Sequence, residues 1–191
     1  MKYHTIVVDP PWQFDQAWAT NGNPYLFYGV RGRKPRGAVA NYSVMTLQDI
    51  AELPVGDWAD PDGAHLYLWT TNTFMDEAYD LVRAWGFKPK TILTWVKPRL
   101  GMGTYYRNST EHVIFAVKGS LKTLRKDCRT AFYGVQGRHS EKPAAFYDMV
   151  ETMSPGPYLD VFARKQRFNW HTWGNEAFTA PGLPEPVRSP L

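Results

Sequence analysis

The sequence predicts an α/β fold in which helices cover both faces of a mostly parallel sheet. Short apolar runs, each with the length of a buried strand, recur along the chain at residues 3–8, 64–69, 91–96, 112–117 and 158–163. Segments with helical periodicity separate several of these runs. Such alternation is typical of parallel strands that are packed between two layers of helices.

Three helices are expected between these strands. The first starts at a Thr46 cap, and the second starts at Thr73, where Asp76 completes a capping box. The third carries Pro143 in its first turn, where the missing N–H costs nothing. A final strand is expected at 168–173.

Length and composition place the chain among globular proteins. Its 191 residues are expected to form one domain over 1–180, followed by a mobile tail, 181–191, that holds four prolines. No apolar run approaches a membrane span, and the start lacks a signal-peptide pattern. The single cysteine, Cys128, excludes an internal disulfide and indicates a reducing, cytoplasmic location. The five histidines are scattered, so no metal site is expected.

Basic residues gather in two segments that are expected to be largely loops. No acid occurs between Gln16 and Gln48, where Arg31, Arg33, Lys34 and Arg36 lie close together. Between residues 97 and 138, nine basic residues face two acids. Aromatic residues make up 15% of the chain, and some are expected to stack on bases. The pattern favours a nucleic-acid partner, although a solvated basic face would look the same.

The tetrapeptide Asp9-Pro10-Pro11-Trp12 follows the first apolar run directly. A buried strand delivers this acid to the carboxyl edge of the sheet, where open α/β folds bind their ligands. The two prolines fix φ and remove two backbone donors, so the turn is stiff and presents carbonyl oxygens. A carboxylate, free carbonyls and an indole face together suit a nucleobase with an amino group. A Pro-Pro turn with Asp9 as a local cap is the structural alternative.

The tetrapeptide and six further blocks resemble one family, that of the catalytic subunit of the eukaryotic mRNA adenosine methyltransferase with its bacterial and phage relatives. The blocks follow in the family's order over about residues 3–176: Asn41 to Met45, Leu66 to Trp69, Trp95 to Lys97, Glu111 to Gly119, His139 to Pro143, and Phe162 to Glu176. The resemblance implies a Rossmann-like class I methyltransferase sheet in a permuted motif order, with S-adenosylmethionine as methyl donor and the adenine N6 amine as acceptor.

The resemblance also implies the residues that act on the acceptor. Asp9, Pro10, Pro11 and Trp12 are the catalytic residues: the Asp9 carboxylate and the Pro10 carbonyl accept the amine hydrogens, and Trp12 stacks on the base. Tyr42 is expected to flank the same base.

At the acceptor strand, Arg107 and Asn108 are expected to make contacts. Glu111 and His112 also match the family, but a strand-start acid and a half-buried histidine explain them equally well, so they stay outside the catalytic set.

The donor site is assigned in the same way. Lys142 matches a lysine that reaches the donor carboxylate, Arg164 an arginine near the ribose and carboxylate, and Asn175 and Glu176 a pair that binds the ribose hydroxyls. The glycine-rich donor loop of other methyltransferases is missing here, because residues 162–167 take its place. The donor is therefore expected to be held by side chains.

Three functions remain open on the sequence. The preferred one is methyl transfer to adenine in DNA, because the chain is compact and lacks accessory domains. The same reaction on RNA is the alternative, since no residue reveals whether a 2′-hydroxyl is recognised. The third is a non-catalytic nucleic-acid-binding partner subunit, against which the intact tetrapeptide counts. A dimer, the recognition sequence and the final proton acceptor are left open.

Overall fold

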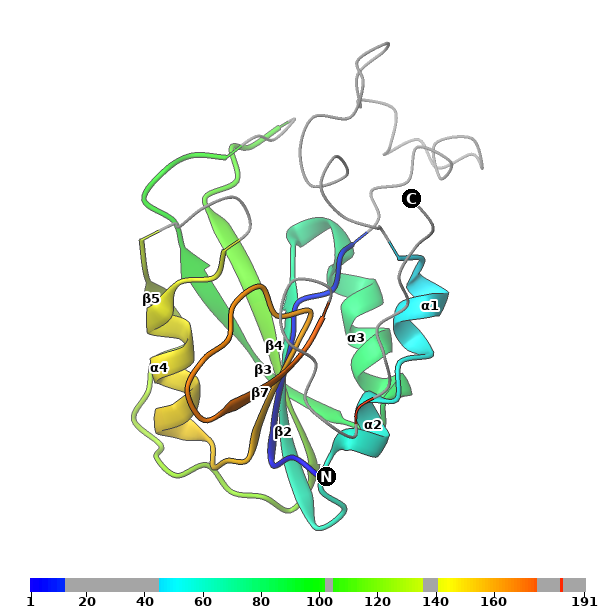
Figure 1. Ribbon diagram of the computed structural model, residues 1–191. Coiled ribbons are helices and arrows are strands. Elements are labelled where there is room, and N and C mark those ends of the chain that lie inside the picture. Colours follow the sequence, from blue (N-terminus) through cyan, green and yellow to red (C-terminus); the bar gives the residue numbers. More distant parts are fainter. Residues whose placement is uncertain (13–44, 102–104, 136–140, 175–182, 184–191) are drawn as a thin grey trace.

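A computed structural model describes residues 1–12, 45–101, 105–135, 141–174 and 183. These residues form a central sheet with helices on both sides (Figure 1). The strands are β1 (Thr5–Val8), β2 (Gly63–Thr70), β3 (Lys88–Val96), β4 (Thr110–Gly119), β5 (Ala131–Tyr133), β6 (Tyr158–Val161) and β7 (Trp170–Trp173). No helix in the described ranges combines the length and the apolar character that crossing a membrane requires.

The seven strands follow the order β5-β3-β4-β2-β1-β6-β7. β1 pairs in parallel with β2 and β6, β6 with β7, and β3 with β5. Only β4 runs against its neighbours in this sheet, pairing antiparallel with β2 and β3. The prediction of a mostly parallel sheet is confirmed.

The sheet order places a topological switch point between β1 and β6. From β1 the chain goes on to β2 on one side, whereas β6 and β7 lie on the other side. In open α/β sheets, ligands bind in the crevice at the carboxyl ends of two such strands. The residues that follow β1 and β6 therefore mark the expected binding site.

Helices cover the two faces of the sheet, as predicted. α1 (Leu47–Ala51), α2 (Val55–Trp58) and α3 (Met75–Ala84) lie on one face, and α4 (Ala144–Met153) lies on the other (Figure 1). Alternate β1 residues serve the two cores: Ile6 and Val8 pack with the α1–α3 side, and Val7 packs with α4. This explains the unbroken apolar run, because a central strand is buried on both faces.

Three helix starts can be compared with the sequence. Pro143 is the N-cap of α4, one position before the first turn in which it was expected. Thr46 caps α1 as expected, and a reciprocal capping box forms with Asp49. The capping box predicted at Thr73 is wrong: a 3₁₀ turn, η4 (Asn72–Phe74), precedes α3, which has no side-chain cap. The Thr70 hydroxyl donates to the Phe74 carbonyl at 3.1 Å, and the Phe74 ring is buried. These tertiary contacts favour the tighter turn over the local cap.

Two short elements were not predicted. α2 has four residues and β5 three, and β5 lies in the basic segment that was expected to be largely loop. Only the middle residue of β5 is buried. Segments this short carry too few periodic positions to give a sequence signal. The tail predicted at 181–191 lies outside the described residues except for residue 183.

Candidate active site

Asp9 lies at the switch point of the sheet. It directly follows β1, and its backbone N–H donates to the Val161 carbonyl, at the end of β6, at 3.3 Å. The chain then turns sharply, because the Trp12 N–H donates to the Pro10 carbonyl at 2.8 Å. The Pro10 oxygen therefore already accepts one hydrogen bond, whereas the sequence suggested a free carbonyl. Its second lone pair remains available.

The Trp12 indole is fixed from two sides. Its Nε1 donates to the Trp69 carbonyl at 3.2 Å. The Phe74 ring stacks on it, with the centroids 5.1 Å apart and the planes 11° from parallel. Phe74 thus covers one face of the indole, so a base can stack only on the other face.

A chain of alternating charges starts at Asp9. The Lys142 ammonium lies 3.0 Å from the Asp9 carboxylate and 3.3 Å from one oxygen of Glu111. The other Glu111 oxygen accepts a hydrogen bond from Lys97. The Lys142 ammonium also lies 4.7 Å from the centre of the Trp69 ring. Residues from four different segments are joined in this way, and Glu111, which the sequence analysis set aside, is at the centre.

Burial and charge act differently on the members of this chain. Burial raises the pKa of Asp9, and the Lys142 ammonium only partly opposes that rise. Burial would also raise the pKa of Glu111, but Lys142 and Lys97 outweigh it and lower that pKa. Burial would lower the pKa of Lys142, but the negative charges of Asp9 and Glu111 outweigh that effect and raise it. Glu111 therefore carries the charge that balances Lys142, and Asp9 is the stronger base.

A second buried acid, Asp160, was not predicted. It lies on β6 opposite Val7 and is 6% exposed. The Tyr147 hydroxyl donates to it at 2.9 Å, and the Arg167 guanidinium lies 4.0 Å above the Tyr147 ring. Burial raises the pKa of Asp160 to about 7, and the nearby charge of Asp9 adds to the rise. The sequence feature that could have identified Asp160 is an acid inside an apolar run, because a carboxylate is rarely buried without a role.

Arg164 follows β6 and is close enough for its charge to lower the pKa of Asp9. The turn that carries it is tight. Phe162 has a φ of 66°, and its N–H donates to the Trp173 carbonyl at 2.6 Å. A non-glycine residue in this region is unusual and often marks a functional turn. The structure therefore brings Asp9, Lys142 and Arg164 to one place.

The other predicted residues fall elsewhere. Arg107 and Asn108 are exposed on the loop between β3 and β4, and no direct contact is seen between them and Asp9. Tyr42, Asn175 and Glu176 lie outside the described residues. Across the described ranges, no group of three or more His, Cys, Asp or Glu side chains could hold a metal ion.

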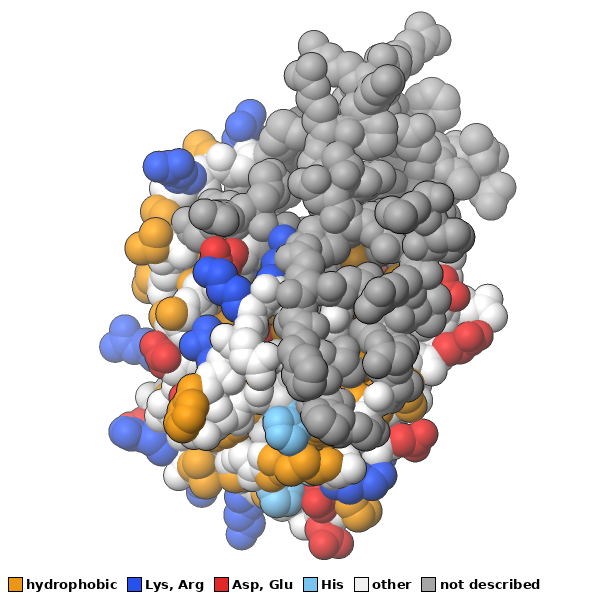
Figure 2. Space-filling model, in the orientation of Figure 1, with side chains coloured by type: hydrophobic (Ala, Val, Ile, Leu, Met, Phe, Trp, Pro, Cys, Tyr) orange, Lys and Arg blue, Asp and Glu red, His pale blue; other side chains and the backbone are white. Residues whose placement is uncertain are grey.

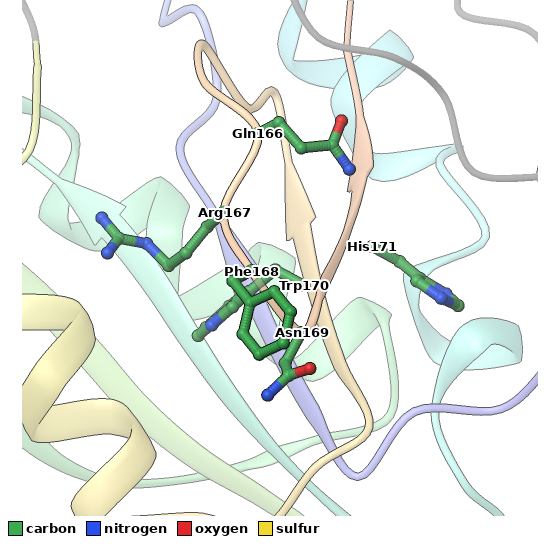
Figure 3. A pocket seen from close by; sticks show the side chains of 6 residues that line it. All are labelled: Gln166, Arg167, Phe168, Asn169, Trp170 and His171. Atoms are coloured by element: carbon green, nitrogen blue, oxygen red, sulfur yellow. The ribbon is translucent and has the colours of Figure 1, made fainter.

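An open hollow lies along the segment that enters β7, lined by residues 166–171 (Figure 3). Arg167 points toward the α4 side and His171 points the opposite way (Figure 3). The His171 ring is already bonded to the Tyr3 hydroxyl at 2.9 Å. Because its side chains diverge and neither Asp9 nor Lys142 lines it, we do not place the chemistry in this hollow.

Comparison with known proteins decides the family. The MT-A70 family model matches residues 3–176. The chain belongs to the MT-A70 family. Membership confirms the predicted resemblance and, with the observed sheet, the class I methyltransferase fold.

Curated relatives of this family member come from animals, plants and fungi. The N(6)-adenosine-methyltransferase MT-A70-like protein of Drosophila melanogaster is 27% identical over 188 residues, covering 92% of this chain and 27% of the relative. The catalytic subunit METTL3 of Homo sapiens is also 27% identical over 188 residues, covering 92% and 28%. The N6-methyladenosine RNA methyltransferase MTA1 of Cryphonectria parasitica is 26% identical over 190 residues, covering 91% and 51%. The chain thus spans between about a quarter and a half of the length of these relatives.

Proposed function

We propose that this protein transfers a methyl group from S-adenosylmethionine to the N6 amine of adenosine in RNA. The observation that carries the proposal is the Asp9–Lys142 pair, at 3.0 Å, in the crevice between β1 and β6. The sequence favoured DNA as the substrate. The names of the relatives favour the alternative, since they name adenosine and one of them names RNA.

Asp9 is suited to act on the acceptor. The exocyclic amine of adenine is a poor nucleophile, because its lone pair is delocalised into the ring. A carboxylate that accepts one of its hydrogens favours a more localised lone pair, and the second lone pair of the Pro10 carbonyl can accept the other hydrogen. The raised pKa of Asp9 also makes it a better acceptor for the proton that the amine loses.

The residues around Asp9 fit the methyl donor. S-adenosylmethionine supplies an electrophilic methyl group on a sulfonium, together with a carboxylate and an ammonium. The Lys142 ammonium has three N–H groups, and Asp9 and Glu111 accept from two of them. The third N–H remains for the carboxylate of S-adenosylmethionine. Arg164 offers a second cation, whose charge reaches Asp9.

Methyl transfer to matched oligonucleotides tests the proposal. The protein is incubated with isotope-labelled donor and with RNA or DNA of the same random sequence, and the modified nucleosides are identified by mass spectrometry. We expect label in N6-methyladenosine from RNA and none in an adenine-free RNA. Label in DNA alone would show that DNA is the substrate, as the sequence predicted. Absence of both transfer and donor binding would support the non-catalytic reading.

A further inference from the structure

The described part of the chain exposes an unusual group of large apolar side chains. Tyr105, Tyr106 and Tyr133 are 86%, 88% and 73% exposed. Leu100 and Val135 are also strongly exposed. All five lie on the β3–β4 loop or on β5 and its end, whereas other exposed apolar residues are scattered. Clustered exposure of this kind marks an interaction surface.

The structure holds this surface together. Tyr133 on β5 lies opposite Val96, the last residue of β3. The β3–β4 loop starts there and is braced across its width, because the Gly101 N–H donates to the Asn108 carbonyl at 2.6 Å and Arg107 Nε donates to the Gly101 carbonyl at 2.7 Å. The exposed tyrosines are therefore carried by a loop and a strand that backbone pairing and hydrogen bonds hold in place.

The surface lies at the same edge of the sheet as Asp9. β4 is antiparallel to both β2 and β3, so β3 runs in the same direction as β2 and β1. The end of β3 and the end of β1 consequently face the same way (Figure 1). A nucleic-acid strand bound to the tyrosines could therefore continue toward the crevice between β1 and β6.

The charge around the tyrosines is positive. Arg99 and Arg107 are exposed on the loop, and no acid occurs from residue 97 to residue 110. The next acid, Glu111, is paired with Lys97 and Lys142. Figure 2 shows basic and apolar side chains together at the upper left, over the β3–β4 loop and β5. A second copy of this chain would bring like charges together here, which disfavours self-association.

We propose that Tyr105, Tyr106 and Tyr133, with Arg99 and Arg107, form a platform on which an unpaired nucleic-acid strand stacks as it approaches Asp9. Every base has a π-face that can stack on an aromatic ring, and the arginines meet the phosphates. The bases of a duplex are already stacked on each other and cannot use the platform. This inference rests on the proposed function and narrows its substrate to single strands.

Binding of a fluorescent oligouridine to the full chain tests the platform without requiring methyl transfer. We expect the Tyr105→Ala/Tyr106→Ala double variant to bind at least tenfold more weakly than the parent, since it loses two stacking rings. The Tyr105→Phe/Tyr106→Phe variant should bind within about twofold of the parent, because phenylalanine also stacks. Leu124→Ala is the matched control: Leu124 is 59% exposed and bonds to the end of α4, and its loss should change nothing.

Equal binding by the parent and the double alanine variant would overturn the platform, as would equally tight binding of a duplex. Sedimentation adds a second criterion. A dimer of the parent that the double variant loses, with oligouridine binding unchanged, would show instead that this face joins two copies. Failure of the proposed function looks different: oligouridine would bind normally while no adenine-containing RNA became methylated.

Discussion

At the scale of single residues, the contact between Asp9 and Lys142 is the main finding. Family resemblance assigned Asp9 to the acceptor and Lys142 to the donor, but it gave no contact between them. The 3.0 Å pair places the Lys142 ammonium against the Asp9 carboxylate, so under the proposed function one ammonium would serve both the acceptor and the methyl donor. The sequence could supply the residue types, because the tetrapeptide and the Lys-Pro element are recognisable. It could not supply the pair, because that depends on how α4 is placed against β1.

Asp160 gives a pH-dependent prediction. The folded protein holds the Asp160 proton up to about pH 7, whereas an unfolded aspartate releases it near pH 3.9. Between these values the folded state binds more protons, so this group makes the parent less stable as the pH rises. Asn cannot titrate and can still accept the Tyr147 hydrogen bond. We therefore expect the stability of Asp160→Asn, relative to the parent, to rise by about 2 kcal/mol between pH 5 and pH 8.

Urea unfolding of both proteins at the two pH values measures this change. Tyr147→Phe at the same pH values is a useful companion, because it removes the hydrogen bond but keeps the titrating acid. A stability difference between Asp160→Asn and the parent that is the same at pH 5 and pH 8 would contradict the raised pKa.

At the scale of elements, predictability followed burial and the continuity of the apolar pattern. β1, β2 and β4 were located well, because β1 and β2 are buried over their full length and β4 contains the uninterrupted apolar run 113–117. β3 begins at Lys88, before its expected start, because its first half is largely exposed. The start of α3 was wrong, because the tertiary contacts of Phe74 override a plausible cap. Local pattern alone could not reveal those contacts.

A buried hydrogen-bond network ties β2 to the end of α4. His65 Nε2 contacts the Leu121 carbonyl at 3.1 Å, so it carries the proton, and Nδ1 accepts from the Ser154 hydroxyl at 2.7 Å. The Tyr67 hydroxyl then donates to the Ser154 oxygen at 2.7 Å. All of these side chains are buried, and burial lowers the pKa of His65, which favours the neutral ring.

Replacing Ser154 by Ala should destabilise the fold. The change leaves His65 Nδ1 and the Tyr67 hydroxyl buried without partners, and each such group costs about 1–3 kcal/mol. We expect a loss of about 3 kcal/mol in the free energy of unfolding, measured by urea denaturation. Ser120→Ala is the control, because Ser120 is exposed, and it should lose less than about 0.5 kcal/mol. Equal stability of the two variants would show that the network contributes nothing.

At the scale of the whole molecule, the site exists only through the sheet order. Asp9, Glu111, Lys142 and Asp160 come from distant parts of the chain, and they meet because β1 lies between β2 and β6. The length of the chain predicted that the tetrapeptide and the residues assigned to the donor share one domain. Asp160 escaped notice because no motif named it, and Glu111 was left out of the catalytic set because a strand-start acid explained it equally well.

The basic loop should determine how RNA binding responds to salt. Each phosphate contact on a single strand contributes about 0.7 to the slope of log K against log salt concentration. We expect Arg99→Gln/Arg107→Gln to reduce the slope by about 1.4, with affinity measured by fluorescence anisotropy between 50 and 300 mM salt. Lys88→Gln/Lys90→Gln, two exposed lysines at the start of β3, is the matched control and should leave the slope unchanged. The same slope in both double variants would contradict a role for the loop.

The most direct test of the account compares catalysis with donor binding in Asp9→Asn. Asparagine keeps the shape of the side chain but removes the base, so the loss should fall on the chemical step. We expect single-turnover methylation of adenine-containing RNA to slow at least 100-fold, while calorimetry shows an S-adenosylmethionine affinity within about threefold of the parent. Turnover that matches the parent would show that the carboxylate at the end of β1 does not act on the adenine amine.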